Sequence, residues 1–205
     1  MKNKKEFWLL FALLGVQLII YAIGESCGYR AYFLTSFIDD KIPLIKWFVY
    51  FYVIWYPMWV LVPYIVSLYS KEKYLKYFAT ALVCIFISLI IFVAFPTIMA
   101  EPVITETDYT SKLITLLFII GSPTKCIPSL HVVYATMFVL PLIKEDKIPK
   151  YLKVIIWILA IGIILSTIFI KKHLIYDVIT GILVAVISWI IVDKFKLYKY
   201  LEKII

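Results

Sequence analysis

The stretch Ser-Pro-Thr-Lys-Cys-Ile-Pro-Ser-Leu-His, residues 122–131, is where a polar loop gives way to a long apolar segment. The stretch Lys-Lys-His-Leu-Ile-Tyr-Asp, residues 171–177, marks a second such place. His131 and His173 are the only histidines in the chain, and each lies at one of these two boundaries. We expect a membrane helix to begin near each histidine, so that the two helix starts organise the fold.

Asp177 lies four residues after His173 and is the only acidic residue within its apolar segment. Four residues are about one helical turn, so a helix would place the two side chains on one face. An ionisable side chain at membrane depth is costly and is by default a functional residue. We therefore predict that His131, His173 and Asp177 form one catalytic site.

The composition indicates a membrane protein. Of the 205 residues, 64% are hydrophobic and 17% are charged, whereas soluble domains are about half apolar and about a quarter charged. The net charge is +8, but the only arginine is Arg30 and there is no basic stripe. Lysines that flank apolar segments are better explained by membrane topology than by nucleic-acid binding. We expect no nucleic-acid partner, and a single integral membrane domain over residues 1–205 embedded in the lipid bilayer.

Six apolar segments are expected to cross the bilayer, which makes the fold class all-α, a six-transmembrane-helix bundle. They are residues 7–24, 47–69, 75–95, 129–143, 152–170 and 173–192. The first follows a lysine-rich start and has no small-residue cleavage site after it, so we expect it to remain uncleaved. Pro57 and Pro63 should kink the second helix rather than end it. Residues 113–120 fall short of the ~20 that a crossing needs and are expected as a re-entrant or half-buried piece.

The lysines predict the orientation. The amino end, the turn at 70–76, the loop at 144–153 and the carboxyl tail carry 14 basic residues, whereas the alternate loops carry seven. The positive-inside rule then predicts that both termini are cytoplasmic. Both histidines consequently lie at the extracytoplasmic boundary. Because the abundant Lys and Ile hint at an AT-rich bacterial genome, we expect a bacterial inner (plasma) membrane protein with its active site facing outside.

Two imidazoles and a carboxylate suit displacement at phosphorus. One histidine can attack phosphorus to form a phosphohistidine. A carboxylate on its Nδ1–H fixes the tautomer, and the second histidine transfers protons to and from oxygen. The transferred group also needs cations and hydrogen-bond donors around its oxygens. The candidates for substrate binding on the outer side are Ser129, Lys125, Lys171, Lys172 and Arg30, together with Lys112.

Two motifs resemble those of a known family. Pro128-Ser-Leu-His131 resembles the Pro-Ser-Gly-His motif of the type 2 phosphatidic acid phosphatase superfamily. Ser166-Thr-(five residues)-His173-(three residues)-Asp177 resembles its Ser-Arg-(five)-His-(three)-Asp motif. The resemblance is closest to the branch of inositol phosphorylceramide synthases and their bacterial relatives, and it covers roughly residues 30–190.

The resemblance assigns roles to the site. It implies that His173 is the nucleophile, Asp177 its partner, His131 the general acid and base, and Ser129 a phosphate contact. The family's first motif, Lys-(six)-Arg-Pro, is absent, since Arg30 is preceded seven residues earlier by isoleucine and followed by alanine. Thr167 replaces the arginine of the last motif, so other cations must bind the phosphate. The sphingolipid-synthase branch also lacks the first motif.

The expected function is therefore a lipid phosphatase. We expect hydrolysis of a lipid phosphate or diphosphate at the extracytoplasmic face, with phosphatidic acid, phosphatidylglycerol phosphate or polyprenyl diphosphate as candidate substrates, and neither a metal nor another cofactor. Transfer to an alcohol would instead make the protein a lipid head-group phosphotransferase.

Several alternatives remain open from the sequence. The intramembrane carboxylate also suits a small membrane transporter, and the missing arginines suit a noncatalytic scaffold. Two histidines and one carboxylate can bind a metal. Cys27 and Cys126 are both expected in outer loops, where a disulfide between them is possible, but no spacing rule decides it.

Overall fold

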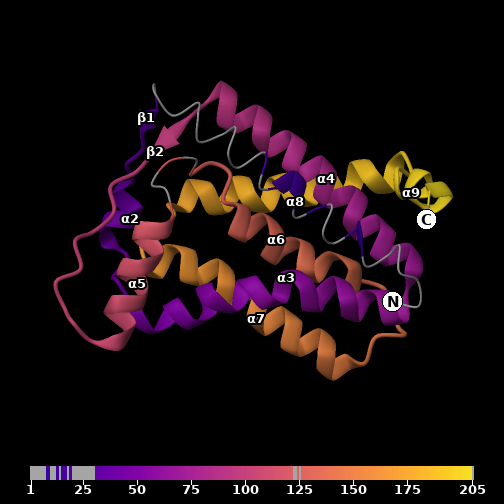
Figure 1. Ribbon diagram of the computed structural model, residues 1–205, viewed down its shortest axis with the longest axis horizontal. Helices are drawn as coiled ribbons and strands as arrows, with labels where there is room; N and C mark the ends of the chain where they lie inside the picture. Colours follow the sequence, from indigo (N-terminus) through magenta and orange to yellow (C-terminus); the bar gives the residue numbers. More distant parts are fainter. Residues whose placement is uncertain are drawn as a thin grey trace.

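The computed structural model describes residues 8, 9, 13, 15–17, 19, 31–121, 124 and 126–204. This part of the chain is mostly helical (Figure 1). Its elements are β1 Tyr32–Phe33, α2 Phe37–Lys41, η2 Lys46–Phe48, α3 Val49–Tyr69, α4 Lys71–Ala94, β2 Thr97–Ile98, α5 Tyr109–Ile120, α6 Leu130–Val139, η3 Leu140–Leu142, α7 Lys150–Phe169, α8 Ile175–Lys194 and α9 Tyr198–Ile204.

Four of these helices are long and apolar enough to cross a membrane, which indicates an integral membrane protein. They are η2 continued by α3 (Lys46–Tyr69), α4 (Lys71–Ala94), α7 (Lys150–Phe169) and α8 (Ile175–Lys194). They match the predicted segments 47–69, 75–95, 152–170 and 173–192. The third begins earlier than residue 75 because Ser70 accepts a hydrogen bond from the Lys73 amide, at 3.3 Å, and caps α4. Pro57 and Pro63 lie inside α3 without ending it, as predicted.

The other two predicted segments, 129–143 and 7–24, are not among the helices long enough to cross a membrane in the described part of the chain. Segment 129–143 contains ten residues of α6 and three of η3, which is shorter than a helix of about 20 residues that crosses a bilayer. Segment 7–24 lies mostly outside the described residues, although Trp8, Leu9 and Leu13 within it are helical. Six crossings and cytoplasmic termini therefore remain predictions.

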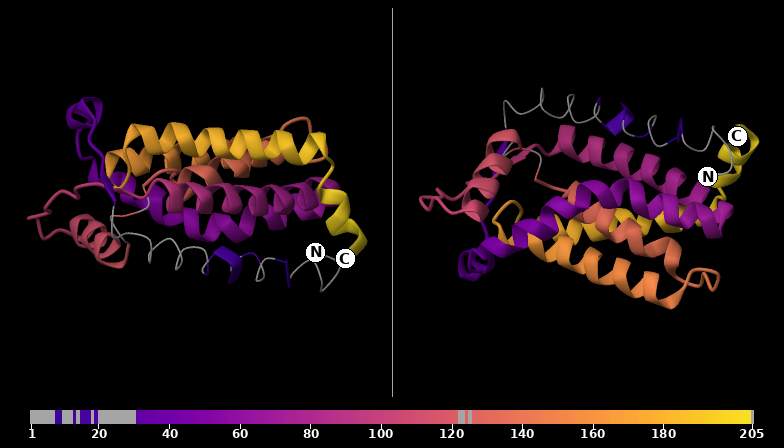
Figure 2. Two further views of the ribbon diagram at one scale, coloured as in Figure 1. Left: turned by 90° about the horizontal axis from the view of Figure 1, so that it is seen from above. Right: turned by 60° about the horizontal axis from the view of Figure 1, so that its bottom comes forward.

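Helix α6 is the centre of the bundle. Every residue from Val132 to Val139 is buried, and α6 packs against α3, α4, α7 and α8. Two views show the longer helices running around it (Figures 1 and 2). A helix that is apolar on all faces belongs in a protein core or in a membrane, and α6 is enclosed by other helices of the bundle.

A small parallel sheet fixes the loop that leads into α6. Strand β1 pairs with β2 through Tyr32↔Thr97 and Phe33↔Ile98. The buried hydroxyl oxygen of Thr97 accepts hydrogen bonds from the amides of Cys126, at 3.0 Å, and Ile127, at 3.3 Å. The sheet is thereby attached to the residues just before the first histidine motif. Cys27, the other half of the possible disulfide, lies outside the described residues.

Helices α6 and α8 approach most closely at Gly181. A Cβ atom built there would lie 2.9 Å from Val132 Cβ and 3.0 Å from the backbone oxygen of Ser129. Both distances are shorter than a normal van der Waals contact, so only glycine allows this approach. Because each helix carries one sequence motif at its start, the contact helps to set the separation of the two motifs.

We expect Gly181→Val to destabilise the protein. The added side chain must push α6 away, and overpacking of this kind costs about 1–3 kcal/mol. Thermal unfolding in detergent, followed by circular dichroism at 222 nm, should show a lower Tm. The matched control is Leu183→Phe, which adds volume at an exposed position of the same helix and should leave Tm unchanged. Equal Tm values for both variants would contradict a close α6–α8 contact.

Candidate active site

His131 lies at the start of α6. Ser129 is the N-cap residue, and its side-chain oxygen accepts a hydrogen bond from the Val132 amide at 3.5 Å. The Ser129 amide donates to the backbone oxygen of Asp177 at 3.2 Å. The two motifs, separated by about forty residues, are therefore joined directly through the main chain.

His173 lies in the turn between α7 and α8, not inside a helix. The expectation that a helix begins at His173 is corrected by the structure, in which α8 begins at Ile175. Leu174 is extended and forms the N-cap, and its amide donates to Asp177 Oδ2 at 2.9 Å. An acidic residue at the third helical position that accepts from the N-cap amide is one half of a capping box. His173 and Asp177, four residues apart, therefore lie on either side of the N-cap of α8 and not within one helix.

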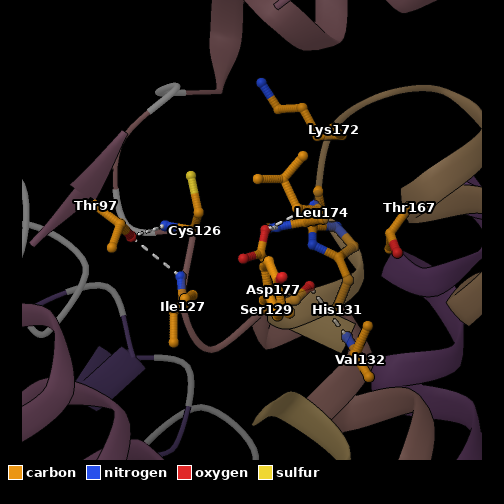
Figure 3. A network of polar contacts seen from close by, with 12 residues as sticks. Thr97, Cys126, Ile127, Ser129, His131, Val132, Thr167, Lys172, Leu174 and Asp177 are labelled. Atoms are coloured by element: carbon orange, nitrogen blue, oxygen red, sulfur yellow. Dashed lines mark hydrogen bonds and ion pairs between the residues drawn. The ribbon is translucent and has the colours of Figure 1, made fainter. Parts of the chain in front are cut away.

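Asp177 contacts His173 through the same oxygen that caps the helix. Asp177 Oδ2 lies 3.1 Å from His173 Nδ1, and the carboxylate is fully buried. This contact orients the ring and leaves Nε2 as the nitrogen available to a substrate. Within the described part of the chain, Asp177 Oδ1 has no hydrogen-bond partner. Figure 3 shows the Leu174 amide bonded to the Asp177 carboxylate.

The two imidazole rings lie close to one another and are tilted. Their centroids are 6.1 Å apart, and their planes are inclined at 50°. His131 Nε2 is buried and has no hydrogen-bond partner among the residues that the structure describes. The structure therefore brings the two predicted catalytic histidines close together.

Aromatic side chains of α3 enclose His131, which the sequence analysis did not anticipate. The Tyr52 ring stacks on the imidazole at 4.2 Å and 24°, with its hydroxyl 3.4 Å from Nδ1. The Trp55 ring lies 4.3 Å away at 36°, and the Tyr56 ring meets the imidazole edge-on at 6.2 Å. The three-residue spacing of Tyr52 and Trp55 was a signal for one helical face. Nothing in the sequence indicated that this face would meet His131.

The predicted substrate-binding lysines that the structure describes have different hydrogen-bond partners. Lys172 is buried and forms an ion pair with Glu101, and its ammonium also lies 3.4 Å from the Gly121 backbone oxygen. Lys171 instead donates to the backbone oxygen of Asp39 at 2.5 Å. Lys125 and Arg30, the other predicted cations, lie outside the described residues.

Ser166 and Thr167, where the resembling motif has Ser-Arg, bond their hydroxyls to the backbone of α7. Ser166 donates to the Ile163 oxygen and Thr167 to the Ile164 oxygen, at 2.6 and 2.7 Å. Thr167 adds a second contact through its own carbonyl, which accepts from the His173 amide at 3.0 Å. Across the described residues, no three His, Cys, Asp or Glu side chains are grouped so that they could share a metal ion.

The comparisons with known proteins place the chain in a family. No curated protein and no solved structure matches it significantly. A model of the PAP2 superfamily, whose members are generally phosphatases, matches residues 19–191. The matched region contains both motifs, the histidine pair, three of the four long apolar helices and most of the fourth, Ile175–Lys194. Because the match covers most of its length, the chain belongs to the PAP2 superfamily.

Proposed function

We propose that this protein is an integral membrane lipid phosphatase that hydrolyses a lipid phosphate or diphosphate through a phosphohistidine on His173. The observation that carries the proposal is the pair of imidazole rings 6.1 Å apart, with Asp177 on Nδ1 of His173. Membership of a superfamily of phosphatases supports the reaction class. Phosphatidic acid, phosphatidylglycerol phosphate and polyprenyl diphosphate are the candidate substrates.

The reaction proceeds in two displacements. His173 Nε2 attacks phosphorus, the bond from phosphorus to the leaving oxygen breaks, and His131 donates a proton to that oxygen. His131 then takes a proton from water as the water oxygen attacks the phosphohistidine, which releases inorganic phosphate and restores His173. Asp177 orients His173 and stabilises the positive charge that develops on its ring.

Negative charge on the transferred group requires stabilisation. The amino end of α6 supplies backbone amides and the positive end of a helix dipole beside His131. We propose Ser129, Lys125, Lys171, Lys172 and Arg30 as further contacts to the phosphate. Lys172 is best supported, because it directly precedes His173 and its charge is buried.

The proposed orientation follows from the lysine distribution. Fourteen basic residues flank the ends opposite the histidines, and seven flank the histidine ends. With both termini cytoplasmic, the site faces the outside of a bacterial plasma membrane.

One observation favours a second candidate, a lipid head-group phosphotransferase. Glu101 compensates the charge of Lys172, and Asp177 adds a further carboxylate to the same site. Two carboxylates near the phosphate repel a doubly charged phosphate monoester more strongly than a singly charged diester. An enzyme that uses a diester lipid would transfer the head group to an alcohol and release no inorganic phosphate.

Covalent labelling tests the proposed function. Purified protein incubated with phosphatidic acid, phosphatidylglycerol phosphate or polyprenyl diphosphate labelled with ³²P should gain label that is stable to base and labile to acid. His173→Ala should abolish it. Asp177→Asn should keep the ring in place and lower the labelling rate by about 10²–10⁴-fold, because the developing charge loses its partner.

Two controls sharpen this experiment. EDTA should leave turnover unchanged, and its loss in EDTA would favour a metal site. Labelled protein with no inorganic phosphate released would favour the phosphotransferase over the phosphatase. Absence of label with all three lipids would contradict a phosphohistidine.

The stacked ring of Tyr52 should support proton transfer by His131. An aromatic face stabilises a cation by about 0.5–2 kcal/mol, so it favours the protonated imidazole that acts as general acid. We expect Tyr52→Leu to lower kcat by about 2- to 30-fold, and Tyr52→Phe, which keeps the ring, to lower it less. Tyr56→Leu is the control, because that ring meets His131 only at its edge. Equal losses for the Tyr52 and Tyr56 variants would argue against a specific stack.

The pairing of Glu101 with Lys172 should limit binding of doubly charged substrates. In Glu101→Gln the ammonium is free to bind phosphate, and we expect kcat/KM for phosphatidic acid to rise by about tenfold, which corresponds to ~1.4 kcal/mol. The rise should be smaller for a phosphodiester lipid. Glu106→Gln is the matched control, since Glu106 is exposed and pairs with Lys46 instead. A fall in kcat/KM would mean that Glu101 is needed to hold Lys172 in place.

A further inference from the structure

The turn that carries His173 is held by a continuous series of backbone hydrogen bonds. The amides of Ile170 and Lys171 donate to α7 carbonyls, and those of Lys172 and His173 both donate to the Thr167 oxygen at 3.0 Å. The Leu174 amide donates to Asp177. Each of these five amides has its acceptor within a few residues. They close the turn locally.

The next amide has a partner from a distant part of the chain. Ile175, the first residue of α8, donates to the carboxylate of Asp39, at 3.1 Å to Oδ1 and 3.3 Å to Oδ2. Asp39 belongs to α2, which is 136 residues earlier in the sequence. A carboxylate at this place also interacts favourably with the positive end of the α8 dipole. Asp39 therefore caps α8 from another element.

Asp39 also contacts the other side of the turn. Its backbone oxygen accepts a hydrogen bond from the Lys171 ammonium at 2.5 Å. Lys171 has φ of 59°, in the left-handed region that is unfavourable for a lysine, and the chain reverses direction there. One residue of α2 is thus bonded two positions before His173 and two positions after it.

The burial of Asp39 supports a specific role. Asp39 is 5% exposed, whereas its neighbour Asp40 on the same short helix is exposed. A buried carboxylate is costly unless hydrogen bonds compensate it. The hydrogen bonds of Asp39 are made to Lys171 and Ile175, on the two sides of His173. They compensate the burial of the carboxylate and hold the turn in place.

We propose that Asp39 is a positioning residue that clamps the 171–175 turn and thereby holds His173 toward His131. The inference rests on the proposed function for its kinetic consequence, but the clamp itself is a property of the fold. Displacement of a reacting group by about 1 Å can lower a rate by about 10²-fold. Loss of the clamp should therefore slow attack on phosphorus and leave lipid affinity largely unchanged.

Three variants of the 205-residue protein in detergent test the clamp. Asp39→Ala removes the carboxylate, Asp39→Asn keeps one oxygen that can accept from Ile175, and Asp40→Ala is the matched control. With phosphatidic acid we expect Asp39→Ala to lower kcat by about 10- to 100-fold with KM within about threefold. Asp39→Asn should recover most of the loss, and Asp40→Ala should behave as the wild type.

Hydrogen–deuterium exchange supplies a readout that needs no activity. Peptides covering residues 170–180 should exchange faster in Asp39→Ala than in Asp40→Ala, while peptides from the α6 core exchange equally. Unchanged exchange in Asp39→Ala would overturn the clamp. Faster exchange with unchanged kcat would overturn its role in positioning His173.

The two proposals fail in different ways. If wild-type protein neither labels nor hydrolyses any of the three lipids, the proposed function is wrong, and the exchange experiment alone still decides whether Asp39 holds the turn. If Asp39→Ala proves too unstable to purify, the residual loss in Asp39→Asn carries the test, and values of kcat and of exchange at residues 170–180 equal to those of Asp40→Ala would overturn the clamp.

Discussion

The site depends on one buried oxygen. Asp177 Oδ2 accepts from the Leu174 amide and lies beside His173 Nδ1. The first contact stabilises the start of α8, and the second orients an imidazole. Because both use the same atom, the orientation of the ring is coupled to the start of α8. A fully buried carboxylate needs such partners, since an uncompensated charge in an apolar bundle would be strongly destabilising.

The proximity of the three proposed catalytic residues and most of the long helices could be predicted from the sequence. Two histidines at polar–apolar boundaries and one acidic residue in an apolar segment indicated that His131, His173 and Asp177 lie together, and in the structure they do. Their catalytic role stays a prediction. The start of α8 was misjudged by two residues, because Leu174 carries no side-chain cap. The signal in the sequence was Asp177, three positions after Leu174, because an acidic residue at that position is typical of a capping box.

Other parts of the site could not be predicted, for a physical reason. Tyr52 and Trp55 surround His131 from another helix, and Asp39 reaches α8 from a short helix far away in the sequence. Periodicity describes which residues share a face, but contacts between elements depend on how those faces meet. In α6 even the face is undefined, since the helix is apolar all round and enclosed on every side.

The main-chain hydrogen bond from Ser129 to Asp177 has an implication for sequence change. Its donor is an amide and its acceptor is a carbonyl, so it does not depend on which side chain either residue carries. At position 129 every amino acid except proline keeps the donor. The spacing of the two helix starts can thus survive wide divergence of the side chains around it.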